Sequence, residues 1–188
     1  MATEQMVGFG GKQAWLAVKG ESPAEVIAAL GLRDLGTVPW RDGIDLAHLT
    51  DDRVAVTPPI DGWILGTGRY LMRPDRPVDV IGLSAALHTE VQYFATHRVT
   101  ESHRWQRAAD GELIRAFGYV GQTGEVTSWH GEPDPVEREA GLPGELDEES
   151  TVLVGENDVL RVAAAWSIDP STLSGRAAPG PLRLGAAD

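Results

Sequence analysis

The dipeptide Asp110-Gly111 stands between two runs of strand-type residues and leaves little freedom to the fold around it. Asp-Gly favours a two-residue hairpin turn, because both central residues of that turn must adopt a positive φ. A second turn is predicted at residues 122–124, where a three-residue loop ends in Gly124. Residues 90–130 are therefore predicted to form a meander of antiparallel strands.

The two turns also predict a register for the meander. With a two-residue loop, the first hairpin places Trp105 opposite Ala116 and His103 opposite Gly118. Side chains alternate between the two faces of a strand, so the register predicts which residues share a face. One face is expected to carry His97, Glu101, His103, Trp105, Gly118, Ser128 and His130. The opposite face is expected to carry Arg104, Phe117, Tyr119 and Trp129.

The first of these faces holds the candidate site. Glu101 and His103 are the candidate catalytic pair, since a carboxylate beside an imidazole suits acid–base chemistry. The candidate binding residues around them are His97, Trp105, Gly118, Ser128 and His130. His97 and His103 lie roughly 20 Å apart along a strand, too far to share a metal ion. No metal and no cofactor is predicted, and the alternative is a polar cluster that only stabilises the sheet.

The rest of the chain alternates between strand and helix patterns. Strands are predicted near residues 13–18, 37–40, 53–57 and 63–66, and residues 41–52 are expected to form a polar loop. Ser22 precedes Pro23 and is a predicted N-cap, with Gly31 ending the helix. A second helix is expected over 78–87. The fold class is predicted to be α+β, a mainly antiparallel sheet with helices packed on one side.

Composition shifts divide the chain into four predicted parts. They are a core domain over 1–142, an acidic linker over 143–156, a docking helix over 157–174 and a disordered tail over 175–188. Residues 157–176 also resemble the middle of a helix-turn-helix, with Pro170 opening the second helix. Ser167 replaces the usual turn glycine, so a docking helix that buries Trp166 is the preferred interpretation.

The charge balance restricts the classes of partner. The formal net charge is −12 and the isoelectric point is about 4.8, which disfavours nucleic acid and anionic membranes. The absence of cysteine excludes disulfides and thiolate catalysis. No signal peptide and no membrane span is predicted, so a cytoplasmic protein with a basic protein partner is expected.

Several dipeptides and their order resemble uncharacterised bacterial proteins, mainly actinobacterial ones. They are the Ser22-Pro23 helix start, Leu30-Gly31, the Gly62-Trp63 strand, the Leu83-Ser84 helix and the Asp110-Gly111 hairpin. The resemblance covers roughly residues 13–120. It implies a shared α+β scaffold and no activity, because no catalytic or binding residue is assigned in those families.

Three functions remain open from the sequence. The first is a protein-binding module, an inhibitor or immunity-type factor for a basic partner. The alternative is an enzyme or small-molecule binder that uses the Glu101 and His103 cluster. The third is DNA binding through the degenerate helix-turn-helix at 157–176.

Overall fold

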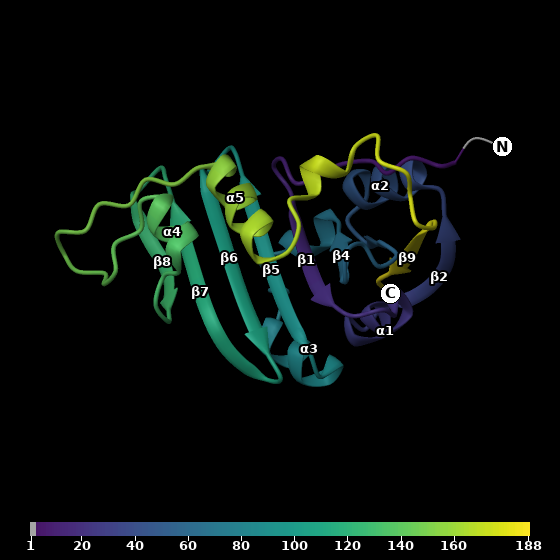
Figure 1. Cartoon of the computed structure of the whole chain (residues 1–188), viewed down its shortest axis with the longest axis horizontal. Helices are drawn as coiled ribbons and strands as arrows, with labels where there is room; N and C mark the ends of the chain where they lie inside the picture. Colours follow the sequence, from purple (N-terminus) through teal and green to yellow (C-terminus); the bar gives the residue numbers. More distant parts are fainter. Residues whose placement is uncertain (1–2) are drawn as a thin grey trace.

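A single antiparallel sheet of nine strands organises the computed structural model, which describes residues 3–188 (Figure 1). The strand order across the sheet is β2-β9-β3-β4-β1-β5-β6-β7-β8. The strands are β1 (Ala14–Lys19), β2 (Arg33–Val38), β3 (Arg53–Val56), β4 (Trp63–Thr67), β5 (Glu90–His97), β6 (Ser102–Ala109), β7 (Glu112–Val120), β8 (Glu125–His130) and β9 (Leu182–Ala186). The predicted α+β class with a mainly antiparallel sheet is confirmed.

Strand β1 lies at the centre and joins the two halves of the sheet. It pairs with β4 on one side and with β5 on the other, and Trp15 lies opposite Thr67 and Phe94. Its residues from Ala14 to Val18 are all buried, because both faces of this strand are covered. The meander β5–β8 continues the sheet from there, as the turn residues predict.

The C-terminal segment is part of this sheet. Strand β9 pairs with β2 on one side and with β3 on the other, far from β8 (Figure 1). Leu182 and Ala186 are fully buried. The prediction of a disordered tail over 175–188 is therefore wrong. A strand of Leu, Gly and Ala has no clear alternation, so its sequence did not distinguish it from a flexible tail.

Helices cover both faces of the sheet. The helices are α1 (Pro23–Ala29), α2 (Trp40–Leu49), α3 (Val80–Leu87), α4 (Pro135–Glu139) and α5 (Glu156–Trp166), with short 3-10 turns η1 (Arg69–Met72) and η2 (Pro170–Leu173). One core contains residues of α2 and α5 with Trp15, Phe94 and Trp105. The other core contains residues of α1 and α3 with Leu16 and Tyr93. The expectation that the helices pack on one side of the sheet is corrected, because alternate residues of β1 belong to two cores on opposite faces of the sheet.

Capping residues begin three of these helices. Ser22 Oγ accepts a hydrogen bond from Glu25 N at 3.3 Å, as predicted for α1. Asp79 Oδ1 accepts one from Gly82 N at 2.9 Å at the start of α3. Each side-chain oxygen satisfies a backbone donor that has no partner within the helix. Asp134 does the same for α4, which is described with the site below.

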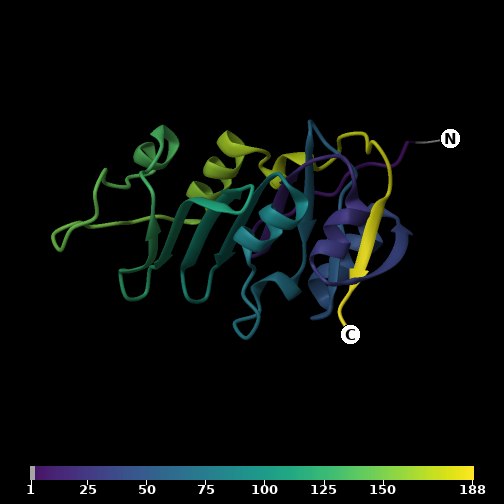
Figure 2. The ribbon, with the colours of Figure 1, turned by 90° about the horizontal axis from the view of Figure 1, so that it is seen from below.

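The segment after β8 is an extended excursion that returns to the sheet. Residues 143–151 leave the body of the molecule, and both ribbon views show this loop projecting beyond β8 (Figures 1 and 2). Val152 and Val154 then re-enter the core, and α5 buries Val159 and Val162 against it. The predicted linker of 143–156 contains this excursion and also the core residues Val152 and Val154. The predicted docking helix of 157–174 overlaps α5 only as far as Trp166.

The segment after α5 does not form a helix-turn-helix. A four-residue 3-10 turn, Pro170–Leu173, occupies the place where the second helix of that motif is expected. Leu173 is buried in the core, and the chain continues towards β9. The helix-turn-helix interpretation is therefore wrong. Within residues 3–188, the structure contains no helix with the length and apolar character needed to cross a membrane.

Candidate functional site

Glu101 and His103 line one cavity of about 340 Å³, which lies beside the turn between β5 and β6. Its volume lies in the range of small-ligand pockets. We call it the carboxylate cavity; its lining residues are Thr96, Arg98, Glu101, His103, Tyr119, Gly121, Leu153, Val154, Gly155 and Glu156. The sheet forms one wall, and the segment leading into α5 forms the other. The structure thus brings the two candidate catalytic residues to a common opening.

His103 is held by a hydroxyl group and not by a carboxylate. Its Nδ1 lies 3.1 Å from Thr96 Oγ1, and the side chains of both residues are buried. Burial lowers the pKa of His103 from its ordinary value of 6.5, while the charges of Glu156, Asp158 and Glu101 act in the opposite direction. Desolvation penalises the charged imidazolium, so the neutral ring predominates at pH 7.

Glu101 occupies the tight turn between β5 and β6. Its φ is 50°, in the left-handed region, and its carbonyl oxygen accepts a hydrogen bond from Gly121 N at 2.9 Å. A Cβ atom at Gly121 would lie 2.8 Å from Glu101 Cβ, so only glycine allows this approach. No hydrogen bond joins Glu101 to His103 among the described residues. The expected acid–base pair is therefore near but not formed.

The opposite wall of the carboxylate cavity adds a second carboxylate. Glu156 Oε2 accepts a hydrogen bond from Lys12 N at 3.0 Å, and Glu156 Oε1 lies 3.7 Å from Arg98 Nη2. Arg98 is the one cation of the lining, against the two carboxylates Glu101 and Glu156. This balance favours a cationic group over an anionic one.

The other predicted site residues do not join this cavity. His97 points to the other side of the sheet, and its Nδ1 lies 3.1 Å from Thr100 Oγ1. Trp105 is fully buried, and Gly118 lies opposite Arg104 and Ser128. His130 is exposed, with Nε2 3.0 Å from the carbonyl oxygen of Leu113. The structure thus keeps Glu101 with His103 and separates the remaining five.

A β-bulge explains the separation of Gly118, Ser128 and His130. Trp105 still shares the strand face of His103, and His97 faces away because residues 98–101 form the loop between β5 and β6. The turn at Asp110-Gly111 sets Ala108 opposite Leu113, but Arg107 then lies opposite Arg115, so Ile114 has no partner. Beyond this bulge the pairing is one residue out of the predicted register, with Trp105 opposite Phe117 and His103 opposite Tyr119. A one-residue shift moves every later side chain to the other face. Thr127 forms a second bulge, in β8, although Ser128 still lies opposite Gly118 as predicted.

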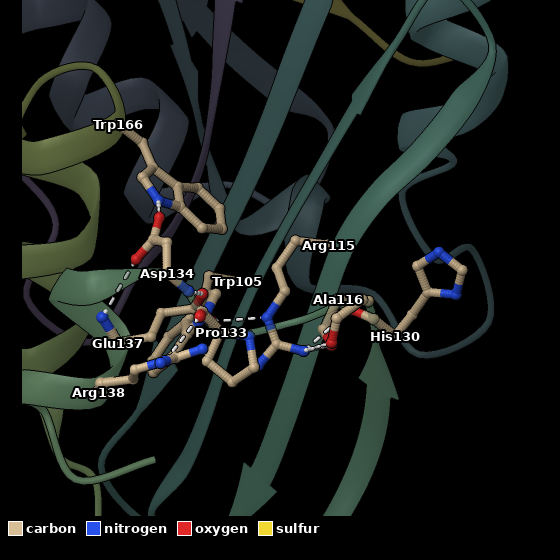
Figure 3. A network of polar contacts seen from close by, with 10 residues as sticks. Trp105, Arg115, Ala116, His130, Pro133, Asp134, Glu137, Arg138 and Trp166 are labelled. Atoms are coloured by element: carbon tan, nitrogen blue, oxygen red, sulfur yellow. Dashed lines mark hydrogen bonds and ion pairs between the residues drawn. The ribbon is translucent and has the colours of Figure 1, made fainter. Parts of the chain in front are cut away.

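A buried polar network on the same sheet face as the cavity was not found from the sequence. Glu137 of α4 accepts hydrogen bonds through Oε1 from Trp105 Nε1 at 2.6 Å and from Arg115 Nε at 2.8 Å (Figure 3). Its Oε2 accepts one from Asp134 N at 2.9 Å, and Glu137 N donates to Asp134 Oδ1 at 3.2 Å. The spacing Asp134-Pro-Val-Glu137 is that of a capping box, and it was the available signal.

The same network fastens α5 to the sheet. Trp166 Nε1 donates to Asp134 Oδ2 at 2.5 Å, and the Arg107 guanidinium lies 4.5 Å from the centre of the Trp166 ring. Arg115 Nη1 donates to the carbonyl oxygens of His130 and Gly131 at 2.9 and 3.0 Å (Figure 3). Arg115 also lies 4.4 Å from the Trp129 ring. These contacts hold α4 and α5 in place, and α5 carries a wall of the carboxylate cavity.

Within the part of the chain that the structure describes, no three histidine, aspartate or glutamate side chains converge in an arrangement that would hold a metal ion.

Comparisons with protein-family models, curated proteins and solved structures found no match for the chain. They do not bear on the resemblance to actinobacterial proteins, and the function must be inferred from the residues of the site.

Proposed function

We propose that the protein is a non-catalytic binding module for a basic protein partner, an inhibitor or immunity-type factor that acts in the cytoplasm. The observation that carries the proposal is one continuous surface. The projecting loop 143–151 continues directly into the segment that lines the carboxylate cavity with Leu153 and Glu156. Acidic charge, exposed apolar side chains and a cavity therefore lie along one stretch of chain.

The charge of this surface is unpaired. The loop carries Glu145, Asp147, Glu148 and Glu149, all exposed and none in an ion pair with a described residue. Unpaired surface charge contributes little to folding but steers the approach of an oppositely charged partner. The net charge of −12 extends the same attraction over the whole molecule.

Exposed leucines supply the apolar contacts that charge alone lacks. Leu153 is 76% exposed at the rim of the cavity, and Leu146 is 39% exposed in the loop. Apolar side chains ringed by polar ones are typical of binding surfaces, where a few anchors carry most of the affinity. Leu153 is the expected anchor, and a basic side chain of the partner would enter the cavity beside it.

The test first isolates the partner and then measures its affinity for variants of the protein. We expect the immobilised protein to retain a stoichiometric basic protein from native lysate at low and moderate salt. With that partner purified, Leu153→Ser should weaken binding about tenfold or more. Leu49→Ser is the matched control, since Leu49 is equally exposed, on α2. Replacing the four loop carboxylates by amides should slow association and reduce its dependence on salt.

Two outcomes would contradict the proposal. The first is the recovery of no stoichiometric partner at either salt concentration. The second is equal binding by the parent protein and Leu153→Ser.

A second candidate function is binding or conversion of a small molecule in the carboxylate cavity. The observation that favours it is the neutral, buried His103 beside Glu101 at the opening. Its weakness is that His103 Nδ1 is engaged by Thr96 and not by a carboxylate. A small cation that binds saturably to the parent protein and not to Glu101→Gln would support this alternative.

A further inference from the structure

A positively charged groove begins at Arg104, on the sheet face opposite the carboxylate cavity, and extends past the start of β1 to Lys12 and His48. It consists of two adjoining cavities of about 540 and 530 Å³, and both are lined by Met72, Arg73, Pro74 and His97. We call this pair the basic groove. Arg104 also lines the larger cavity, and Lys12 and Arg69 also line the smaller one. Asp51 is the one carboxylate of the lining, so the groove is positively charged although the chain as a whole is acidic.

The cations of the basic groove differ in their pairing. Arg69 lies 3.1 Å from Asp51, and Arg73 donates to Asp75 at 3.2 and 2.5 Å. Arg104 has neither a hydrogen bond nor an ion pair through its side chain with any residue of 3–188. Arg104 is half-buried, and an incoming anion would not have to displace an existing carboxylate from it. Arg104 is therefore the position where an anion would gain most.

The strand neighbours of Arg104 offer it no counter-charge. Its neighbour on β7 is Gly118, and its neighbour on β5 is the small residue Ala95. Tyr93 lies two residues before Ala95 on β5, and its hydroxyl group donates a hydrogen bond to the carbonyl oxygen of Leu71 at 2.9 Å. Burial raises the pKa of Tyr93 to about 12, while the nearby charge of Arg104 acts in the opposite direction. The guanidinium thus lies between neutral groups that cannot compete for it.

Beyond Arg104 the larger cavity has both apolar and hydroxyl-bearing side chains. Its apolar lining includes Leu71, Met72, Pro77 and Val78, and the hydroxyls belong to Tyr93, Thr100 and Ser102. Its volume of about 540 Å³ is that of a pocket for a small organic molecule. Arginine matches carboxylate and phosphate oxygens with two parallel N–H bonds, which a single water does not replace.

We propose that the basic groove binds a small organic anion, with a carboxylate or phosphate group on Arg104 and an apolar body against residues 71–78. Arg73 lies at the junction of the two cavities and supplies the second cation. The anion position at Arg104 is separate from the surface proposed for the protein partner, since Arg104 and His103 lie on opposite faces of β6. It stands whether or not that partner exists.

Three probes separate the parts of this proposal. Phenyl phosphate carries both the anion and the apolar body, inorganic phosphate carries only the anion, and benzyl alcohol carries only the apolar body. We expect saturable binding of phenyl phosphate by calorimetry or NMR titration, about tenfold tighter than either other probe. Benzoate in place of phenyl phosphate distinguishes a carboxylate site from a phosphate site. Either anion binding in this way supports the inference.

Variants then locate the site. Arg104→Gln should weaken phenyl phosphate binding about tenfold or more, because a charge-assisted bidentate contact is lost. Arg73→Gln should weaken it less, since Asp75 already neutralises Arg73. Arg41→Gln is the control, as Arg41 is exposed on α2 and lines neither cavity. Circular dichroism of each variant checks that the fold is retained.

The inference is overturned by any of three results. They are no saturable binding of either organic anion up to about 10 mM, equal affinity for phenyl phosphate and benzyl alcohol, or an unchanged affinity in folded Arg104→Gln. Should Arg104→Gln not fold, an unchanged affinity in Arg73→Gln together with Ser102→Ala has the same consequence.

Discussion

Arg115 and Glu137 form an ion pair in the interior, with Nε and Oε1 separated by 2.8 Å and side-chain exposures of 2% and 0%. Arg115 belongs to the middle of β7, and Glu137 belongs to a five-residue helix that would be unstable alone. The pair therefore ties α4 to the sheet. Arg115 Nη2 is buried without a partner among the described residues, so Glu137 supplies much of the compensation that this charge receives.

Breaking this pair should be costly. Glu137→Gln keeps the shape of the side chain but leaves the Arg115 charge buried and uncompensated. We expect the free energy of unfolding to fall by about 3–5 kcal/mol, measured by chemical denaturation. Glu139→Gln, on the exposed side of α4, should change it by less than about 0.5 kcal/mol. The double variant Arg115→Met/Glu137→Leu should lose less than the sum of its two single variants; additive losses would show that the pair is not coupled.

Removing β9 should disrupt the sheet. Deletion of residues 180–188 takes the strand from between β2 and β3 and leaves Leu32 and Ile27 without their neighbour Gly185. We expect loss of the cooperative thermal transition of the parent protein. Deletion of Asp188 alone, whose side chain is 98% exposed, is the control. A melting temperature unchanged by the longer deletion would mean that β9 contributes nothing to the folded state.

Gly118→Val should destabilise the protein without affecting His103. A Cβ atom at Gly118 would lie 2.6 Å from Thr127 Oγ1 and 3.3 Å from Ser128 Cβ, so β8 must shift. Overpacking of this kind costs about 1–3 kcal/mol, and the strand preference of valine offsets up to about 1 kcal/mol of it. Thr127→Ala should recover part of the loss.

The NMR titration of His103 is the second measurement on Gly118→Val. Because Gly118 faces the opposite side of the sheet, the titration should be unchanged. A shifted titration, or a variant that melts above the parent, would contradict the observed register.

His103 should make stability depend on pH below neutrality. Its pKa is lowered in the folded protein by burial, so the unfolded chain binds a proton more readily. The contribution of His103 is complete above the unfolded value near 6.5 and is lost as the pH falls from there towards the folded pKa. Its imidazole signals should titrate below pH 6.5.

A variant isolates this contribution, because His48 is shifted in the same direction by burial. The stability difference between pH 7 and pH 5 should be smaller in His103→Gln than in the parent protein. Equal differences in the two proteins would mean that His103 does not contribute.

Local signals predicted much of the fold. Ser22 and its Pro23, the Asp110-Gly111 turn and the apolar pattern of 78–87 each depend on neighbours within a few residues, and each led to the correct element. The meander followed from them, and Glu101 and His103 line one cavity as expected, although Glu101 lies in a turn and not on a strand. Such features are encoded where they occur, so a single sequence is enough to recognise them.

Features that depend on distant contacts were missed. The helix α2 was expected to be a loop, because Asp42, Gly43 and Asp45 obscure the apolar spacing of Trp40, Ile44 and Ala47. The bulge at Ile114 has no glycine to mark it, and it moved Gly118, Ser128 and His130 to the sheet face opposite His103. Arg115 reads as a surface residue until Glu137 is brought beside it by the fold.

The place of β9 in the sheet has a consequence for synthesis. Residues 33–56 leave the ribosome well before residues 182–186 are made. During that interval β2 and β3 lack β9, the strand that pairs with both of them. Until then each presents an open strand edge, the kind of surface that pairs with other chains. The sheet cannot close during translation of its first half. The nascent protein therefore passes through a stage in which a chaperone that shields strand edges would raise its yield.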